Sequence, residues 1–257
     1  MSNCVLKLEH LYKRFGGVEA VRDFSFSIDE GEIVAIIGPN GAGKTTIFNL
    51  ISKIYQPDEG TLTFAGENIT KKSQNETARL GVSRTFQNTR LFTGLSVLDN
   101  VKVALDFEGK YSLLEAMFLL PRRWKRERET TRRAMECLEL LNLDQYASVR
   151  PSNLPYGIQR RVEIARALVS NPKILMLDEP AAGLNPEEVF QLVDFIREIH
   201  EKYPKLAILV IEHRMDLVMN LSDYIYVQDF GQTIAKGVPE EIQNDPLVLK
   251  AYLGEED

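Results

Sequence analysis

The chain contains, at residues 38–45, the run Gly38-Pro39-Asn40-Gly41-Ala42-Gly43-Lys44-Thr45, which matches in full the pattern G-x-x-x-x-G-K-[ST] of phosphate-binding loops. The preceding residues 33–37 are apolar and few enough for a buried strand. After the loop, apolar residues recur at helical spacing, at positions 47, 50, 51 and 54. The strand, glycine-rich turn and helix that such a loop requires are therefore all predicted, which a chance glycine-rich turn does not explain.

The chemistry expected of this loop follows from its residue types. Glycines let backbone N–H groups close around phosphate oxygens, and the N-terminus of the following helix adds positive potential. Lys44 is expected to reach the β- and γ-phosphates of a nucleotide, and the hydroxyl of Thr45 to bind Mg²⁺. The expected nucleotide-binding residues of the loop are Gly38, Pro39, Asn40, Gly41, Ala42, Gly43, Lys44, Thr45 and Thr46.

The composition is that of an ordinary globular protein and argues against several classes of function. The 257 residues carry a net charge of -6, so the molecule is not a basic nucleic-acid binder, and we expect no nucleic-acid partner. The two cysteines, Cys4 and Cys137, lack metal-like spacing and fit a reducing cytosol. We find neither the apolar core of a signal peptide nor a run near the ~18 apolar residues of a membrane span. A role at a membrane would therefore require a partner.

The order of the predicted elements indicates an α/β fold. The N-terminal part is rich in short strand candidates separated by turn signals such as Gly16-Gly17. Residues from about 91 to 166 are helical in pattern, and two apolar runs beyond them flank an amphipathic helix that begins at Asn185-Pro186. Apolar strands that alternate with helices predict a mostly parallel α/β core. The strand candidates besides 33–37 are residues 5–8, 24–28, 61–64, 174–177 and 207–211.

Two adjacent acids, Asp178 and Glu179, end the apolar run 174–177 and predict the second half of a nucleotide site. Ligands bind at strand ends in α/β sheets. Asp178 suits Mg²⁺, held through water, and Glu179 suits a general base that orients and deprotonates an attacking water. Two carboxylates at a buried strand end would be costly without a cation, which makes a purely structural role a poor explanation.

Two further polar residues follow strand-like runs. His213 comes after the run 207–211 and could hydrogen-bond the γ-phosphate or the attacking water, whereas a lone histidine is more often structural. Gln87 follows a run that ends at Phe86 and could bind Mg²⁺ and contact water. Taken alone, each residue leaves both interpretations open. His10 and His200 lack such a context.

In this order, these pieces resemble the ATP-binding cassette (ABC) family, and the resemblance covers essentially the whole chain. Phe15 precedes the phosphate loop where the family stacks adenine, Gln87 matches the Q-loop, and His213 matches the switch histidine. Asp178-Glu179-Pro180 matches the second nucleotide motif, and residues 181–185 match the D-loop. Where the family has its Leu-Ser-Gly-Gly-Gln signature, this chain has Leu154, Pro155, Tyr156, Gly157 and Ile158.

The resemblance implies a fold, cofactors and a division of the chain. It implies a P-loop NTPase core, with a mostly parallel sheet and an N-terminal antiparallel β subdomain, formed by residues 1–88 and 167–257, and an inserted α-helical subdomain at 89–166 that carries the signature. The cofactors are ATP and Mg²⁺. The implied catalytic residues are Glu179, His213 and Gln87, and the implied metal ligands are Thr45, Gln87 and, through water, Asp178.

The resemblance also implies partners. In the family, two ATPase subunits dimerise head to tail, and each ATP is held by the phosphate loop of one chain and the signature of the other. Two membrane permease subunits and, indirectly, a solute-binding protein complete an importer, which would place this chain at the cytoplasmic face of the inner membrane. Pro155 replaces a serine that would donate to the γ-phosphate, and proline has no N–H. Either the two sites are unequal and the dimer is a heterodimer, which we favour, or the loop compensates locally.

Several short segments resemble more narrowly the ATPases of branched-chain amino acid importers. They are Arg84-Thr85-Phe86-Gln87, the Leu-x-Tyr-Gly signature, residues 179–186, Ile211-Glu212-His213 and residues 251–255. The alternatives are an ABC ATPase that exports lipid and a soluble ABC ATPase without a transport role. A kinase or GTPase would leave the block 154–168 without a purpose. The basic segment 122–133 could be a solvated helical face or a surface for anionic lipid or a membrane partner.

Overall fold

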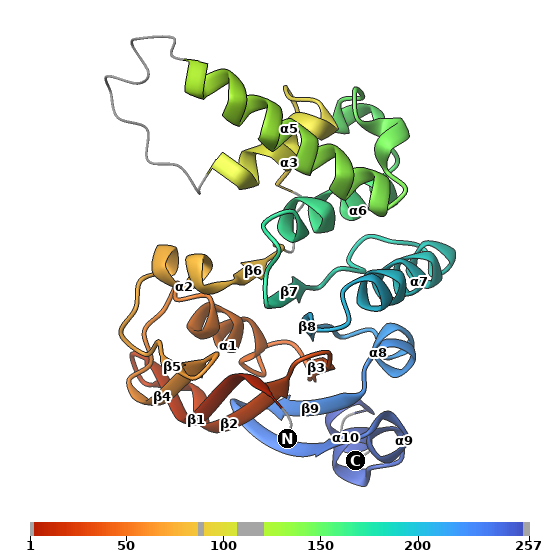
Figure 1. The fold of residues 1–257 in the computed structure, drawn as a ribbon. Coiled ribbons are helices and arrows are strands. Elements are labelled where there is room, and N and C mark those ends of the chain that lie inside the picture. Colours follow the sequence, from red (N-terminus) through yellow and green to blue (C-terminus); the bar gives the residue numbers. More distant parts are fainter. Residues whose placement is uncertain (1–2, 87–89, 107–120, 254–257) are drawn as a thin grey trace. The chain divides into compact units, whose positions relative to one another are not determined.

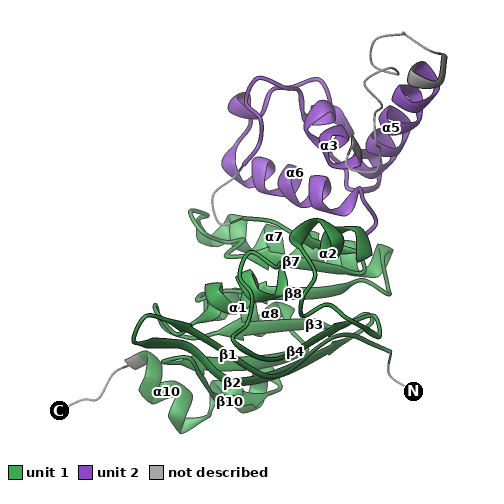
Figure 2. Ribbon diagram, turned by 90° about the vertical axis from the view of Figure 1, so that its left-hand side faces the viewer, with its two compact units in different colours: residues 1–87, 173–257 green, residues 88–172 purple. Residues whose placement is uncertain are grey.

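The computed structural model describes residues 3–86, 90–106 and 121–253 of the chain. The chain divides into two compact units, which Figure 2 shows in different colours. The core unit consists of residues 1–87 and 173–257, and the helical unit consists of residues 88–172. The helical unit is therefore a single insertion in the sequence of the core unit.

A six-stranded sheet forms the centre of the core unit (Figure 1). In chain order, its strands are β3 (Ile33–Ile37), β6 (Val82–Arg84), β7 (Ile174–Asp178), β8 (Ala207–Ile211), β9 (Tyr224–Asp229) and β10 (Gln232–Gly237). The spatial order is β10-β9-β3-β8-β7-β6, and every neighbouring pair is parallel except β10 and β9. The central strands β3, β7 and β8 are buried along their whole length, as apolar runs in a parallel sheet should be.

The N-terminal part of the core unit forms a separate antiparallel sheet. Its strands are β1 (Cys4–Phe15), β2 (Val18–Asp29), β4 (Glu59–Phe64) and β5 (Glu67–Asn68), in the order β2-β1-β4-β5. The hairpin between β1 and β2 turns at Gly16, whose φ of 58° favours glycine. Both long strands extend beyond the predicted runs, because β-bulges carry them past polar stretches such as Glu9-His10. The predicted α/β fold, with its N-terminal antiparallel part, is confirmed.

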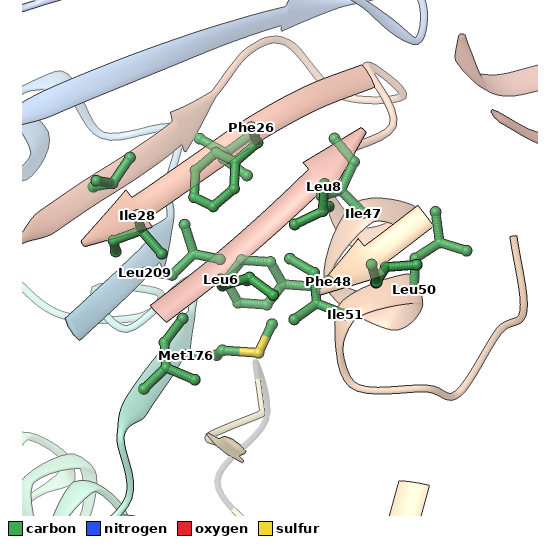
Figure 3. Close-up of a cluster of buried hydrophobic side chains, with 14 of the residues drawn as sticks. Leu6, Leu8, Phe26, Ile28, Ile47, Phe48, Leu50, Ile51, Met176 and Leu209 are labelled. Carbon is green, nitrogen blue, oxygen red and sulfur yellow. The ribbon is translucent and has the colours of Figure 1, made fainter. Parts of the chain in front are cut away.

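An apolar core lies between the two sheets and around helix α1 (Lys44–Ile51) (Figure 3). The antiparallel sheet contributes alternate side chains of its strands, and α1 contributes its apolar face. The residues labelled in the figure are Leu6, Leu8, Phe26, Ile28, Ile47, Phe48, Leu50, Ile51, Met176 and Leu209. Burial of this face anchors α1 along its length, so the start of α1, where the phosphate loop ends, is held firmly against the sheet.

The remaining helices of the core unit are α2 (Gln74–Leu80), α7 (Pro186–Lys202), α8 (Met215–Leu221), α9 (Pro239–Gln243) and α10 (Pro246–Leu253). Helix α7 begins as the sequence predicts. The side chain of Asn185 accepts a hydrogen bond from the backbone N–H of Glu188 at 3.0 Å, and the Glu188 carboxylate accepts one from the Asn185 N–H at 3.0 Å. The sequence analysis did not predict α2, α8, α9, α10, β9 or β10, because each has eight residues or fewer and such short segments give little periodicity.

The helical unit contains α3 (Val97–Asp106), α5 (Pro121–Leu140) and α6 (Tyr156–Leu168). These three helices pack against one another through buried side chains such as Val101, Leu138 and Val162. Arg160 and Glu163 of α6 form an ion pair of 3.1 Å whose side chains are both almost fully buried. Among the residues that the structure describes, no helix is long and apolar enough to cross a membrane.

Candidate functional site

The phosphate loop connects β3 to α1 in a conformation that requires glycine at two positions. Gly38 has a φ of 150°, and a Cβ there would lie 2.0 Å from the backbone oxygen of Gln228. Gly43 has a φ of 95°, and a Cβ there would lie 2.3 Å from the backbone oxygen of Ala20. Both approaches are shorter than any real contact, so the loop packs tightly against neighbouring strands. The two glycines let the loop backbone take a fixed shape at the end of β3.

The N-terminus of α1 is open to an anion. Gly43 is its N-cap, no side chain caps it, and its first turn contains no acidic residue. The first N–H groups of a helix have no partner within the helix, so here they are available to a ligand with negative charge. Thr45 is exposed and Thr46 half-buried at this end. The loop and α1 therefore fit the phosphates of a nucleotide.

Lys44 is the buried cation of this loop. Its side chain donates hydrogen bonds to the backbone oxygens of Gly38 at 2.7 Å and Pro39 at 2.8 Å. Burial lowers the pKa of Lys44, while the nearby carboxylates of Glu179 and Glu212 oppose that shift. The lysine thus lies inside the loop with two carbonyl oxygens as its partners, and phosphate oxygens are stronger acceptors for the same ammonium group.

Asp178, the last residue of β7, is buried and paired with an arginine that we did not predict as part of the site. Its Oδ2 accepts a hydrogen bond of 2.6 Å from Nη2 of Arg84, the last residue of the neighbouring strand β6. Fewer than a tenth of either side chain is exposed. The cation that a buried carboxylate requires is therefore present in the chain itself.

Glu179 lies in a different environment from Asp178, although the two are adjacent. Its φ of 45° is rare for a residue other than glycine, and its N–H donates to the backbone oxygen of Ile211 at 2.9 Å. Such a conformation costs roughly 1–3 kcal/mol, and strained residues of this kind cluster at functional sites. The carboxylate is partly exposed, and its Oε2 lies 4.0 Å from Nδ1 of His213. The structure therefore brings the predicted base and the predicted switch histidine together.

Glu212, between β8 and His213, is the buried acid that sequence reasoning passed over. Its carboxylate accepts hydrogen bonds from the N–H groups of Ala181 at 2.8 Å, His213 at 3.1 Å and Arg214 at 3.4 Å. Burial raises the pKa of Glu212, and these three bonds partly oppose the shift. Glu212 therefore ties the segment after Glu179 to the segment of His213. An acid directly after a fully apolar strand is the signal that could have identified it.

Phe15 ends β1 with an exposed aromatic ring. The side chain is 43% exposed, and its ring meets the ring of Tyr55 edge to face at a centroid distance of 5.2 Å. The Nζ of Lys13 lies 5.5 Å from the centre of the Phe15 ring. An exposed ring in this setting can stack on a planar base.

Only some of the predicted magnesium ligands lie in the part of the chain that the structure describes. Thr45 and Asp178 are present, whereas Gln87, the third predicted ligand, lies outside the residues that the structure describes. Residues 3–86, 90–106 and 121–253 contain no cluster of three or more His, Cys, Asp and Glu side chains that could hold a metal. Magnesium in nucleotide sites needs no such cluster, because it keeps several waters and binds one or two protein groups together with phosphate oxygens.

The signature residues lie in the helical unit, at the start of α6. Leu154 is buried, whereas Pro155 and Tyr156 are exposed, and Gly157 and Ile158 are half-buried. Pro155 is the N-cap of α6 and makes no capping hydrogen bond through its side chain. Its backbone oxygen accepts from the N–H of Ile158 at 3.0 Å. The signature of this chain therefore lies, like the phosphate loop, at a helix N-terminus without a side-chain cap.

Comparison with known proteins agrees with this geometry. The family model described as ABC transporter matches residues 21–182, and the model described as branched-chain amino acid ATP-binding cassette transporter matches residues 232–257. The high-affinity branched-chain amino acid transport ATP-binding protein LivG of Salmonella typhimurium is 46% identical to the chain over 99% of its length and 100% of the relative. The corresponding protein BraF of Pseudomonas aeruginosa is 44% identical over the same shares.

Solved structures show the same fold. The ADP conformation of MJ1267, an ATP-binding cassette of an ABC transporter, matches with a TM-score of 0.86 and 34% identity, over 98% of this chain and 99% of that one. A nucleotide-free ATP-binding cassette from an ABC transporter matches with a TM-score of 0.85 and 36% identity, over 98% and 100%. The dimeric structure of MJ0796, a bacterial ABC transporter cassette, matches with a TM-score of 0.74 and 26% identity, over 91% and 98%. With its phosphate loop, its two strand-end acids and these relatives, the chain belongs to the ABC transporter family of ATP-binding proteins.

Proposed function

We propose that the chain is the ATP-hydrolysing subunit of an importer of branched-chain amino acids. The observation that carries the ATPase function is the convergence of three segments at the carboxyl ends of neighbouring parallel strands. The phosphate loop follows β3, Asp178 and Glu179 end β7, and Glu212 and His213 follow β8. The solute is inferred from the names of relatives such as LivG and BraF, because the residues of this site fit a nucleotide and carry no information on a transported solute.

The nucleotide would be held by the core unit. Phe15 stacks on the adenine, and the N–H groups of the loop and of the start of α1 bind the phosphates, as do Lys44 and Thr46. Thr45, Gln87 and, through water, Asp178 would hold Mg²⁺. When bound, the metal supplies positive charge that offsets the charge of the phosphates. The loop residues assigned to the nucleotide are Gly38, Pro39, Asn40, Gly41, Ala42, Gly43, Lys44, Thr45 and Thr46.

Hydrolysis would depend on Glu179 and His213. The Glu179 carboxylate accepts a proton from the attacking water, and the water oxygen then forms a bond to the γ-phosphorus as the bond to the leaving ADP oxygen breaks. His213 hydrogen-bonds the γ-phosphate or the attacking water, and Gln87 contacts the same water. Glu212 fixes the backbone of both segments through its three accepted hydrogen bonds. The proximity of Glu179 and His213 supports this assignment.

The working unit would be a dimer of ATPase subunits bound to two membrane permeases. Residues 154–158 of each chain would complete the ATP site of the other. The structure of the related cassette MJ0796 is a dimer, which supports a dimeric working unit. Because Pro155 lacks both a hydroxyl and an N–H, we favour a heterodimer with a second ATPase subunit that supplies the fuller signature. The complex would lie at the cytoplasmic face of the inner membrane and receive its solute from a binding protein.

The test is transport by the complete complex. The chain is co-expressed with candidate permeases and a second ATPase subunit, reconstituted in liposomes, and given labelled leucine on a solute-binding protein with ATP. We expect uptake that requires ATP and that Lys44→Ala in this chain reduces. ATP-dependent movement of lipid without uptake would show an exporter. Turnover that depends on neither permeases nor liposomes would show a soluble ATPase.

A further inference from the structure

Arg84 is a buried cation near the nucleotide site whose two Nη atoms donate hydrogen bonds, whereas its buried Nε has no hydrogen-bond partner among the described residues. It ends β6 and is buried. Its Nη1 donates hydrogen bonds of 2.8 Å to Oδ1 of Asn49 and of 2.8 Å to Oγ of Ser52, while its Nη2 donates to Asp178 at 2.6 Å. Through these three hydrogen bonds, the guanidinium connects β6 to β7 and to the C-terminal end of helix α1.

Two aromatic rings lie beside this guanidinium. The ring centres of Phe48, on α1, and Phe86, after β6, lie 5.4 Å and 5.3 Å from Cζ of Arg84. Arginine presents its donors as a rigid fork and stacks on aromatic faces, whereas lysine is a point charge on a flexible stem. The site therefore selects arginine by shape as well as by charge.

The charge balance at Asp178 explains why such a residue is needed. A buried carboxylate without a counter-charge is strongly unfavourable, and this one must be present before any nucleotide brings Mg²⁺ to the site. Arg84 supplies that charge through Oδ2 of Asp178. When Mg²⁺ is held through water beside the same carboxylate, its charge also offsets that of Asp178. The carboxylate then no longer depends on Arg84 alone. Arg84 and the metal are therefore alternative partners of one charge.

We propose that Arg84 is a positioning residue that serves as the resident counter-cation of Asp178 in the nucleotide-free protein and holds this carboxylate ready for Mg²⁺. The proposal rests on the proposed role of Asp178 in binding the metal. It also makes Arg84 the link between Asp178 and β6, the strand that leads into Gln87. Loss of the arginine should make the binding of ATP depend more strongly on Mg²⁺.

The test compares Arg84→Met, which removes the charge, with Arg84→Lys, which keeps the charge but loses the fork. Arg160→Met is the matched control, because Arg160 is also an arginine in a buried ion pair but lies in the helical unit. Two quantities are measured on the full chain: the Tm of the nucleotide-free protein in EDTA, and the Kd of ATP in EDTA divided by the Kd of ATP in Mg²⁺.

We expect Arg84→Met to lower the Tm in EDTA and to raise the Kd ratio by roughly tenfold or more, because an unpaired buried carboxylate gains more from an added cation than a paired one does. In Arg84→Lys the Kd ratio should stay much closer to that of the wild type, because the charge is kept. Arg160→Met should lower the Tm and leave the ratio as in the wild type. A ratio in Arg84→Met within about twofold of the wild type, together with a lowered Tm in EDTA, would overturn the proposal and leave Arg84 a purely structural residue.

A double variant keeps the proposal testable if Arg84→Met folds poorly. Removal of both charges of a buried pair is far less harmful than removal of one, so Arg84→Met combined with Asp178→Asn should melt higher than Arg84→Met alone. If it does not, the pairing inference fails. Asp178→Asn alone tests the proposed function separately: a Kd ratio equal to that of the wild type would reject Asp178 as a metal residue while the Tm comparison still reports on the pair.

Discussion

The starts of helices α1 and α6 both lack a side-chain cap, and both are expected to face the phosphates of an ATP. Helix α1 begins at Lys44 after a glycine in the left-handed conformation, and helix α6 begins at Tyr156 after Pro155. The first belongs to the core unit and has a buried lysine within its loop. The second belongs to the helical unit and carries two exposed residues, Pro155 and Tyr156, at its start.

The difference between these helix ends lies in what surrounds them. The carboxylates of Glu179 and Glu212 lie near the lysine of the loop before α1. Arg84 of β6 donates to Asp178 of the neighbouring strand β7, and Glu212 accepts from the N–H of Ala181. At the start of α6, residues 154–158 include no acidic or basic side chain. An open helix end binds an anion, but only the first has the acids and cations that chemistry on that anion requires. The α1 end should therefore bind and cleave ATP, and the α6 end should act only on the ATP of a partner.

The largest expected effect is that of Glu179→Gln, which tests whether cleavage belongs to the α1 end. Loss of a general base should lower ATP turnover by roughly 10²–10⁴-fold, because glutamine cannot accept the proton of the attacking water. ATP binding should persist, and the variant should form dimers with ATP. Turnover is measured by phosphate release and dimers by size-exclusion chromatography, with the exposed Glu201→Gln as the control. Normal turnover in Glu179→Gln would remove this residue from the base role.

The next effect concerns ATP binding at the α1 end and uses two buried lysines of the same region. Lys44→Ala should weaken ATP binding by roughly 10–100-fold, the value of a charge-assisted hydrogen bond to phosphate. Lys53 is the matched control, because it is equally buried just beyond the end of α1 and donates to the backbone oxygen of Thr70 at 2.7 Å. Burial lowers the pKa of Lys53 to about 8.

Lys53→Ala should therefore lower the Tm and leave the Kd of ATP unchanged, as measured by isothermal titration calorimetry. Equal losses of affinity in both variants would mean that Lys44 acts through the stability of α1 and not through the phosphates. Lys44 would then not be the cation that binds phosphate at the α1 end.

The contrast between local and distant signals explains what the sequence could and could not predict. The phosphate loop, β3, β7 and β8 are encoded in runs of a few adjacent residues, so pattern and spacing reveal them. The contact of Arg84 with Asp178 spans 94 positions, and that of Glu212 with Ala181 spans 31. Such contacts exist only once β6, β7 and β8 are side by side, and no local pattern encodes them.

A smaller effect is expected at the α6 end, where Pro155→Ser restores a hydroxyl. A serine at this N-cap position should stabilise the helical unit by about 0.5–2 kcal/mol, because its oxygen can accept from the first N–H groups of α6. The same hydroxyl should strengthen the ATP-dependent dimer by roughly tenfold, through one added hydrogen bond to a charged phosphate.

Pro155→Ala is the control for this change, since it restores the backbone N–H without the hydroxyl. Dimer affinity is measured in the Glu179→Gln background by analytical ultracentrifugation, and stability by denaturant unfolding. If neither substitution changes the affinity of the dimer, the signature loop already compensates locally for Pro155. Pro155 then gives no reason to expect a heterodimer.

The smallest expected effect is a pH dependence of stability that arises from Glu212. Its pKa is raised in the folded protein by burial, so between its unfolded value of 4.5 and its higher folded value the native state binds more protons than the unfolded state. The free energy of unfolding should therefore fall as the pH rises through this window. Glu212→Gln cannot titrate and should flatten this slope, as measured by urea unfolding from pH 4.5 upward, with the exposed Glu201→Gln as control. An unchanged slope in Glu212→Gln would mean that the three N–H groups stabilise the charged carboxylate in the folded protein as well as water does in the unfolded chain. The rigidity of the α1 end would then come from the loop and Arg84.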